Sequence, residues 1–125
     1  MLGSTTILIV DANAYNGLGL SLAIEQSDGC VAGPVATAAD VRMILDSRSI
    51  AGAIVDCDID DSEATDVVVL LAGEGIPTVV QTVWPPPTAL QSLNGKTTVL
   101  IKPVDATLVL NALLIEIDRK ADYPA

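Results

Sequence analysis

The sequence is poor in the residue types that form most metal and ligand sites. Among its 125 residues there is no histidine and no phenylalanine, and there are only one tryptophan and two tyrosines. Its two cysteines, Cys30 and Cys57, do not form a C-x-x-C pair, and without histidine they offer no zinc site. We expect both cysteines to be buried as small hydrophobic side chains of a protein in a reducing compartment.

Basic residues are also scarce, which excludes several classes of partner. Lysine and arginine total 6 against 16 acidic residues, and the formal net charge is −10. A nucleic-acid-binding face requires clustered basic residues, and anionic lipid attracts them as well. We therefore expect no nucleic acid and no membrane as a partner, whereas clustered carboxylates suit a divalent cation. The apolar run Ile7–Val10 is too short for a signal peptide or a membrane span, so we expect a cytoplasmic protein.

Aliphatic residues, by contrast, are abundant and are arranged in short runs. Half of the residues are hydrophobic, which is enough for a sizeable core in a single domain covering 1–125. A weak run, Cys30–Ala32, stops at Gly33-Pro34. Four clearer runs, of strand length and mostly β-branched, predict strands at 7–10, 51–55, 78–80 and 99–101.

The longer segments between these runs have helical periodicity. The first places Leu18 and Leu22 on one helical face, while Thr37 and Asp105 precede later segments as candidate N-caps. A crossover must join the third and fourth strands if they are parallel neighbours, so we interpret the valine-rich segment between them as a helix. The predicted helices are 14–26, 38–47, 63–75, 88–93 and 106–120. Five alternating strand–helix units predict an α/β fold, a doubly wound parallel sheet of five strands.

Polar residues stand at the ends of four predicted strands. Asp11 follows the first strand, Asp56 the third and Lys102 the fifth, and Thr82 ends the fourth. Ligands bind at the carboxyl ends of strands in doubly wound sheets, so we expect these side chains to meet. A carboxylate can attack phosphorus and hold an acyl phosphate, and a second carboxylate favours a hard cation such as Mg²⁺. A lysine and a hydroxyl can contact the phosphate oxygens, so the group predicts a phosphoryl-accepting site.

These residues lie in motifs that resemble the receiver domain of two-component response regulators. The likeness extends from Ile7 to about Lys120. The motifs that carry it are ILIVDA at 7–12, GAIVDCDID at 52–60, IPTVVQT at 76–82 and VLIKP at 99–103. The resemblance implies a (βα)5 flavodoxin-like fold with the strand order 2-1-3-4-5.

By position, the resemblance also assigns a role to each site residue. Asp56 matches the phosphoacceptor, Thr82 the switch hydroxyl, and Lys102 the lysine that contacts the phosphoryl group. Asp11 matches the first member of the acidic pair, and Asp58 falls where a backbone carbonyl usually contacts the metal. The implied cofactor is therefore Mg²⁺, with Asp11, Asp56 and Asp58 as its ligands.

Three positions depart from the pattern of this family. Ala12 occupies the second acidic position, which places the metal affinity and the phosphorylation rate in question. Val99, three residues before Lys102, replaces the usual aromatic switch residue. Thr82 is followed by Val83, Trp84 and three prolines, which we expect to stiffen the segment.

The resemblance implies a stand-alone signalling domain rather than a classical enzyme. A histidine kinase or histidine phosphotransfer protein would phosphorylate Asp56 with Mg²⁺ bound. The output would be contact with a downstream protein, or a homodimer formed through the fourth helix, fifth strand and fifth helix.

Two alternatives remain open at this point. The first is a pseudo-receiver that acts as an interaction module without phosphorylation, as the alanine at position 12 suggests. The second is a small phosphatase that uses Asp56 and Asp58, because Asp56-Cys57-Asp58 resembles the D-x-D motif of the haloacid-dehalogenase class.

Overall fold

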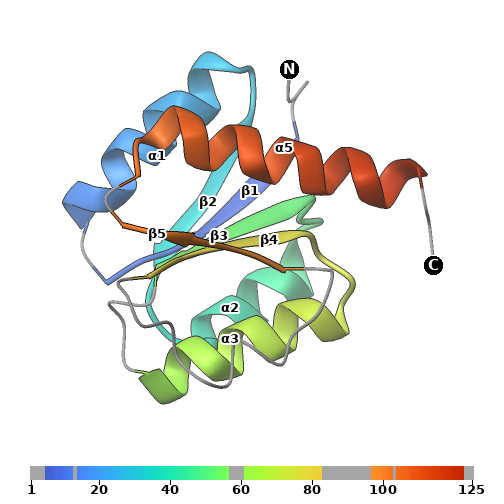
Figure 1. The fold of residues 1–125 in the computed structure, drawn as a ribbon. Coiled ribbons are helices and arrows are strands. Elements are labelled where there is room, and N and C mark those ends of the chain that lie inside the picture. The colour runs from blue at the N-terminus through green and yellow to red at the C-terminus, as the bar shows by residue number, and fades with distance from the viewer. Residues whose placement is uncertain (1–4, 13, 57–60, 83–96, 103, 123–125) are drawn as a thin grey trace.

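Strands and helices alternate along the chain from residue 6 to residue 82 (Figure 1). The computed structural model describes residues 5–12, 14–56, 61–82, 97–102 and 104–122, and the predicted helix at 88–93 lies outside these ranges. The elements are β1 (Thr6–Val10), α1 (Ala14–Gln26), β2 (Cys30–Val35), α2 (Ala38–Ser47), β3 (Gly52–Asp56), α3 (Asp61–Gly73), β4 (Thr78–Thr82), β5 (Thr97–Ile101) and α5 (Ala106–Asp122).

The five strands form one parallel sheet in the order β2-β1-β3-β4-β5. Figure 1 shows α1 and α5 over one face of the sheet and α2 and α3 over the other. This arrangement confirms the predicted doubly wound α/β fold and its strand order. All five strands run in the same direction, so their C-terminal ends lie on one side of the molecule. We call this side the carboxyl end of the sheet. The strand order reverses between β1 and β3, and ligand sites form at this point in such folds.

The core consists of two hydrophobic layers, one on each face of the sheet. Successive residues of a strand face opposite sides, so Ile54 packs with α1 and α5 whereas Ala53 and Val55 pack with α2 and α3. All five residues of β3 are buried. Burial of a valine, leucine or isoleucine side chain contributes about 1.5–3 kcal/mol. This burial stabilises the position of the central strands, and with it the position of the polar residues at their ends.

Helix α5 approaches β3 closely at Gly52. A Cβ atom at this position would lie 3.1 Å from Cδ1 of both Leu113 and Ile117, which is tighter than an ordinary van der Waals contact. The missing side chain lets α5 pack directly on the sheet. This close packing explains why a glycine stands within the apolar run at 51–55.

Two side chains hold the N-terminus of α2. Oγ1 of Thr37 accepts a hydrogen bond of 3.2 Å from the backbone N–H of Asp40, which confirms the predicted N-cap. Oε2 of Glu63, in α3, accepts a second bond of 2.7 Å from the backbone N–H of Ala38. Both satisfy donors that have no partner within the helix, and the second also joins α2 to α3.

The remaining helix boundaries lie close to those predicted. Helix α3 is shifted by two residues from the predicted 63–75, and α5 extends two residues beyond 120. Oδ1 of Asp105 accepts a hydrogen bond of 2.9 Å from the backbone N–H of Leu108, so the predicted cap of α5 is confirmed.

Helix α1 presents two of its leucines to solvent. Leu18 and Leu22 share a face, as predicted, but they are 64% and 58% exposed. Leu20 and Ile24 form the buried face instead. Both pairs have the same spacing of four residues, so helical periodicity does not distinguish the core face from the solvent face.

Strand β2 continues beyond its predicted end. It spans Cys30–Val35, so the prediction that it stops at Gly33-Pro34 is wrong. The register between β1 and β2 shifts within this stretch, and a proline is tolerated at such an irregularity of an edge strand. A Cβ atom on Gly33, whose φ is 94°, would lie 2.5 Å from the backbone oxygen of Ile9. Glycine is therefore what lets the two strands stay paired here.

The prediction that both cysteines are buried is wrong for Cys30, whose side chain is exposed. This residue begins β2, which lies at the edge of the sheet with a strand on one side only. Cys57 lies outside the described residues.

Candidate functional site

Asp11 and Asp56 lie on adjacent strands at the carboxyl end of the sheet. Each directly follows one member of the register pair Val10 and Val55, so β1 and β3 bring both aspartates to the same end. Asp11 is 4% exposed and Asp56 2% exposed. Two carboxylates that are buried on neighbouring strands favour a cation beside them, because their negative charges repel each other.

Lys102 supplies such a cation. Its Nζ lies 2.6 Å from Oδ2 and 2.7 Å from Oδ1 of Asp56, so the ammonium contacts both carboxylate oxygens. Because β4 lies between β3 and β5, the lysine side chain crosses the end of β4 to reach Asp56. Its side chain is 20% exposed, compared with 3% for the aspartate. The carboxylate is therefore the buried member of the pair, and the ammonium is the member that remains partly exposed to solvent.

Thr82 ends β4 between the two partners of this ion pair. Asp56 pairs with Gln81 in the sheet, so Thr82 lies one residue further toward the carboxyl end, and it is 3% exposed. Its backbone oxygen accepts a hydrogen bond of 2.8 Å from the backbone N–H of Lys102. This bond extends the β4–β5 ladder by one residue and fixes the point at which Lys102 leaves the sheet. Asp11, Asp56, Thr82 and Lys102 are thus all placed at one end of the sheet.

The donor atoms at this end fit a hard divalent cation that keeps several water ligands. Asp11 and Asp56 offer carboxylate oxygens, which Mg²⁺ prefers, and Mg²⁺ is commonly held by one or two carboxylates. Ala12 is exposed beside them and adds no ligand. Within the described ranges no group of three or more acidic or cysteine side chains could hold a metal. The third predicted ligand, Asp58, lies outside those ranges.

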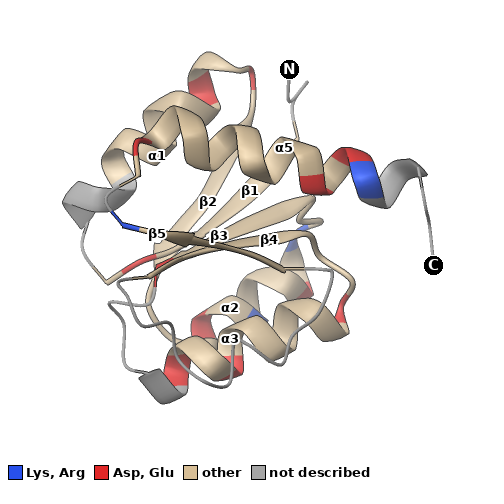
Figure 2. Cartoon of the chain, in the orientation of Figure 1, with Lys and Arg blue, Asp and Glu red and all other residues tan. Residues whose placement is uncertain are grey.

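The charge of the molecule is mostly acidic. Figure 2 shows acidic positions on helices of both layers and only a few basic ones. A net charge of −10 repels a phosphate-bearing molecule at long range. Against this acidic background, Lys102 places a positive charge at the carboxyl end of the sheet.

Gln81 is a site residue that the sequence pattern did not reveal. It is 7% exposed, and it is the register partner of Asp56 across β3 and β4. Residues paired across parallel strands direct their side chains to the same face, so the side chains of Gln81 and Asp56 leave the sheet on the same side. A polar residue directly before the strand-final Thr82 was the available signal, but a single glutamine has no chemical signature of its own.

The sheet order, the paired aspartates and the lysine after β5 together define the fold of a receiver domain. The chain is similar to the response regulator receiver domain protein (CheY-like) of Methanospirillum hungatei JF-1, with 20% identity, a TM-score of 0.81, and coverage of 94% of this chain and 97% of that one. It is also similar to the response regulator receiver protein of Sinorhizobium medicae WSM419, with 17% identity, a TM-score of 0.79, and coverage of 94% and 98%.

A third similar structure is the receiver domain of a sensor histidine kinase from Pseudomonas aeruginosa PAO1, with a magnesium ion coordinated in its active-site cleft. The identity is 20%, the TM-score is 0.72, and 92% of this chain and 98% of that one are covered. No protein-family model and no curated protein sequence matches the chain. At these identities the likeness establishes the fold, and it confirms the predicted resemblance at that level. None of the described helices is long and apolar enough to cross a membrane.

Proposed function

We propose that this chain is a phosphoacceptor receiver domain of a two-component phosphorelay. A histidine kinase or histidine phosphotransfer protein donates a phosphoryl group to Asp56 with Mg²⁺ bound, and the phosphorylated domain signals through protein–protein contacts. The observation that carries the proposal is the contact of Lys102 Nζ with both carboxylate oxygens of the buried Asp56. The receiver-domain fold supports it.

The proposed step is a transfer of a phosphoryl group from nitrogen to oxygen. One carboxylate oxygen of Asp56 attacks phosphorus, the bond from phosphorus to the donor histidine breaks, and its electron pair stays on the imidazole nitrogen. The ammonium of Lys102 offsets the charge of the carboxylate before the transfer and attracts the phosphoryl oxygens after it. The hydroxyl of Thr82 offers those oxygens a hydrogen-bond donor. Burial of Asp56 limits the access of water to the acyl phosphate.

Asp11 and Asp56 are the residues that would hold Mg²⁺ in this reaction. When bound, the ion neutralises the charge that develops on the transferring phosphoryl oxygens. The magnesium ion in the receiver domain from Pseudomonas aeruginosa supports this assignment. Ala12 leaves the pair one carboxylate short, so we expect weak binding of the metal.

The test is the intact mass of the protein after incubation with acetyl phosphate and Mg²⁺. We expect one phosphoryl adduct on the wild-type chain and none on Asp56→Asn. Asp46→Asn is the matched control, because Asp46 is an exposed carboxylate on α2, and this variant should keep the adduct. An adduct that persists in Asp56→Asn, or no adduct on the wild-type chain at high acetyl phosphate, contradicts the proposal.

The pseudo-receiver is the second candidate function, and the alanine at position 12 favours it. This function predicts an unmodified chain under the same conditions, together with a partner that binds the wild-type chain and Asp56→Asn equally well. The phosphatase alternative depends on Asp58, which lies outside the described residues. Turnover of a generic phosphate ester that is lost in Asp58→Asn would support it.

We further propose that the face formed by β5 and α5 makes the output contact, as a homodimer or with a downstream protein. Three large apolar side chains on these two elements are exposed: Ile101 by 39%, Leu108 by 55% and Ile115 by 58%. Exposed large apolar side chains on two packed elements favour a protein–protein contact there.

A further inference from the structure

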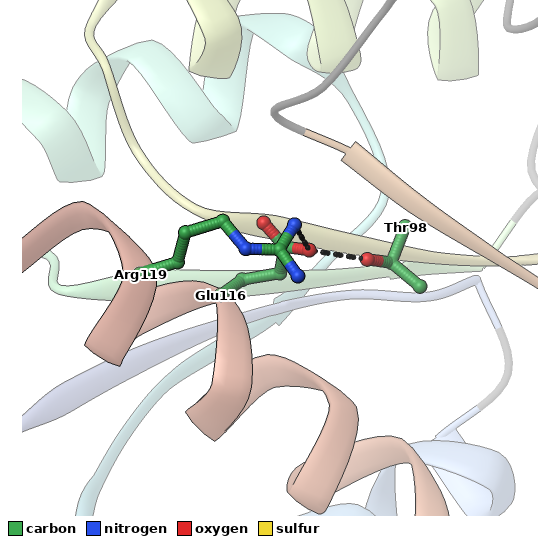
Figure 3. Close-up of polar contacts among 3 residues, drawn as sticks. All are labelled: Thr98, Glu116 and Arg119. Carbon is green, nitrogen blue, oxygen red and sulfur yellow. Dashed lines mark hydrogen bonds and ion pairs between the residues drawn. The ribbon is translucent and has the colours of Figure 1, made fainter. Parts of the chain in front are cut away.

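Glu116 in α5 is a buried acid far from the proposed phosphorylation site. It is 7% exposed, and among the described acidic residues only Asp11, Asp56 and Glu116 are buried. Its Oε1 accepts two hydrogen bonds, one of 2.7 Å from Oγ1 of Thr98 in β5 and one of 3.2 Å from Nη1 of Arg119 (Figure 3). A buried carboxylate is costly unless such partners are present. The site chemistry gives Glu116 no role, so the burial of this acid between α5 and β5 needs another explanation.

The two partners of Glu116 differ in their surroundings. Thr98 belongs to the sheet, whereas the side chain of Arg119 is 57% exposed. One carboxylate oxygen therefore connects the hydroxyl of a strand residue to a guanidinium at the surface. A displacement of β5 that breaks the bond to Thr98 also changes what holds Arg119, because both bonds share the same acceptor atom.

The strand that carries Thr98 also positions Lys102. β5 lies at the edge of the sheet and pairs only with β4. Two side-chain interactions hold this strand in place, one near each end. Thr98 forms a hydrogen bond with Glu116 in α5, and Lys102, directly after the strand, forms an ion pair with Asp56 in β3. The two interactions are four residues, or roughly 13 Å, apart along the strand. A change in the Lys102–Asp56 ion pair therefore acts on β5, the same short strand that Thr98 connects to α5.

We propose that the Thr98–Glu116 hydrogen bond couples the Lys102–Asp56 ion pair to the second half of α5 and to Arg119. Glu116 and Thr98 are positioning residues in this device, and they do not touch the reacting atoms. Phosphorylation of Asp56 is the trigger, so the physiological role of the coupling rests on the proposed function. The coupling itself is a property of the unmodified fold and can be measured without phosphate.

The experiment measures amide hydrogen exchange along α5 when the ion pair is removed by Lys102→Met. In the wild-type background we expect exchange at residues 115–119 to rise by roughly threefold or more beyond the rise at the amides of β3, which report the global loss of stability. In a Thr98→Val background the same substitution should raise exchange at residues 115–119 no more than it does in β3. Thr97→Val is the matched control, since it makes the same chemical change one position earlier and should preserve the response. Thr98→Ser keeps the hydroxyl and should also preserve it.

The first turn of α5 serves as an internal reference. Residues 103–105 join it to Lys102 through the chain, so amides 109 and 110 should respond to Lys102→Met in every background. An equal response of amides 115–119 in the wild-type and Thr98→Val backgrounds overturns the coupling, and so does its loss in Thr97→Val or Thr98→Ser. If Thr98→Val does not fold, Thr98→Ala gives the same comparison.

A second arm repeats the measurement with acetyl phosphate and Mg²⁺ in place of Lys102→Met. If the wild-type chain takes no phosphoryl group but the Lys102→Met arm behaves as expected, the proposed function fails and the coupling stands. If the chain is phosphorylated and amides 115–119 respond identically with and without the Thr98 hydroxyl, the coupling fails and the proposed function stands.

Discussion

Lys102 and Asp56 come from strands that are not neighbours, yet the ammonium of one lies within 2.7 Å of both carboxylate oxygens of the other. The contact spans the end of β4 and joins the edge strand β5 to the central strand β3. It places a positive charge against a buried acid in a chain that has few basic residues to offer. The ion pair therefore connects β5 to β3, and it also contains the proposed phosphoacceptor.

Removal of the lysine should cost more stability than removal of the aspartate charge. Lys102→Met leaves the Asp56 carboxylate buried without its cation, and we expect a loss of about 2 kcal/mol in the free energy of unfolding. Asp56→Asn should cost less than half of this, because the partly exposed lysine can reach solvent. Urea denaturation measures both values, with Arg42→Met on the exposed face of α2 as a control. Equal losses for Lys102→Met and Asp56→Asn would show that the buried charge is not the main term.

Restoration of a second acidic residue should strengthen metal binding. Ala12→Asp adds a carboxylate next to Asp11, and we expect the dissociation constant for Mg²⁺ to fall by roughly tenfold or more. Calorimetric titration measures the constant, and Mg²⁺ should raise the melting temperature of the variant more than that of the wild type. Ala39→Asp adds the same charge at an exposed position of α2 and should leave the affinity unchanged. A similar gain from Ala39→Asp would indicate nonspecific attraction.

The close packing of α5 on β3 predicts opposite effects for two glycine substitutions. Gly52→Ala places a methyl group 3.1 Å from Leu113 and Ile117, and we expect a loss of about 1–3 kcal/mol. Gly19→Ala, in α1, meets no atom within 4 Å and should stabilise the protein by about 0.5–1 kcal/mol. Thermal or chemical unfolding of the two variants compares them directly. A neutral Gly52→Ala would mean that α5 can move away from the sheet at little cost.

The proposed output face predicts that a charge on α5 weakens self-association. Ile115→Glu places a carboxylate in the exposed apolar patch, and we expect any homodimer to weaken by at least about tenfold. Sedimentation equilibrium of the phosphorylated chain measures the constant. Leu22→Glu makes a comparable change at a residue of α1 that is equally exposed, 58% in both cases, and should leave it unchanged. A dimer that responds to Leu22→Glu instead would place the interface on α1.

The sequence contained most of the information about the fold and the proposed site. Short β-branched runs alternating with helical segments allow few arrangements other than a parallel sheet, and the residues after each run must then meet at one end. Asp11, Asp56, Thr82 and Lys102 were predicted on this ground, and all four lie at the carboxyl end of the sheet. Their roles in phosphoryl transfer stay predictions.

The features that could not be predicted depend on three-dimensional packing. The pairs Leu18–Leu22 and Leu20–Ile24 of α1 have equal spacing, so only the packing of α1 on the sheet and on α5 decides which pair faces the core. Glu116 looks like an ordinary charged residue of a helix, and only the positions of Thr98 and Arg119 in the fold make its burial tolerable. Likewise, the pairing of β2 beyond Pro34 depends on how β1 accommodates an irregular register.

That irregularity also affects the behaviour of the protein in concentrated solution. An edge strand with regular, unpaired backbone groups can recruit a strand from another molecule and so start aggregation. In β2, Pro34 lacks a backbone N–H and the shifted register disturbs the regular spacing of donors and acceptors, so this margin is a poor template for a foreign strand. Cys30 begins this edge strand, and its exposed thiol can then remain at the surface without an edge-to-edge pairing of two molecules that would bring two such thiols together.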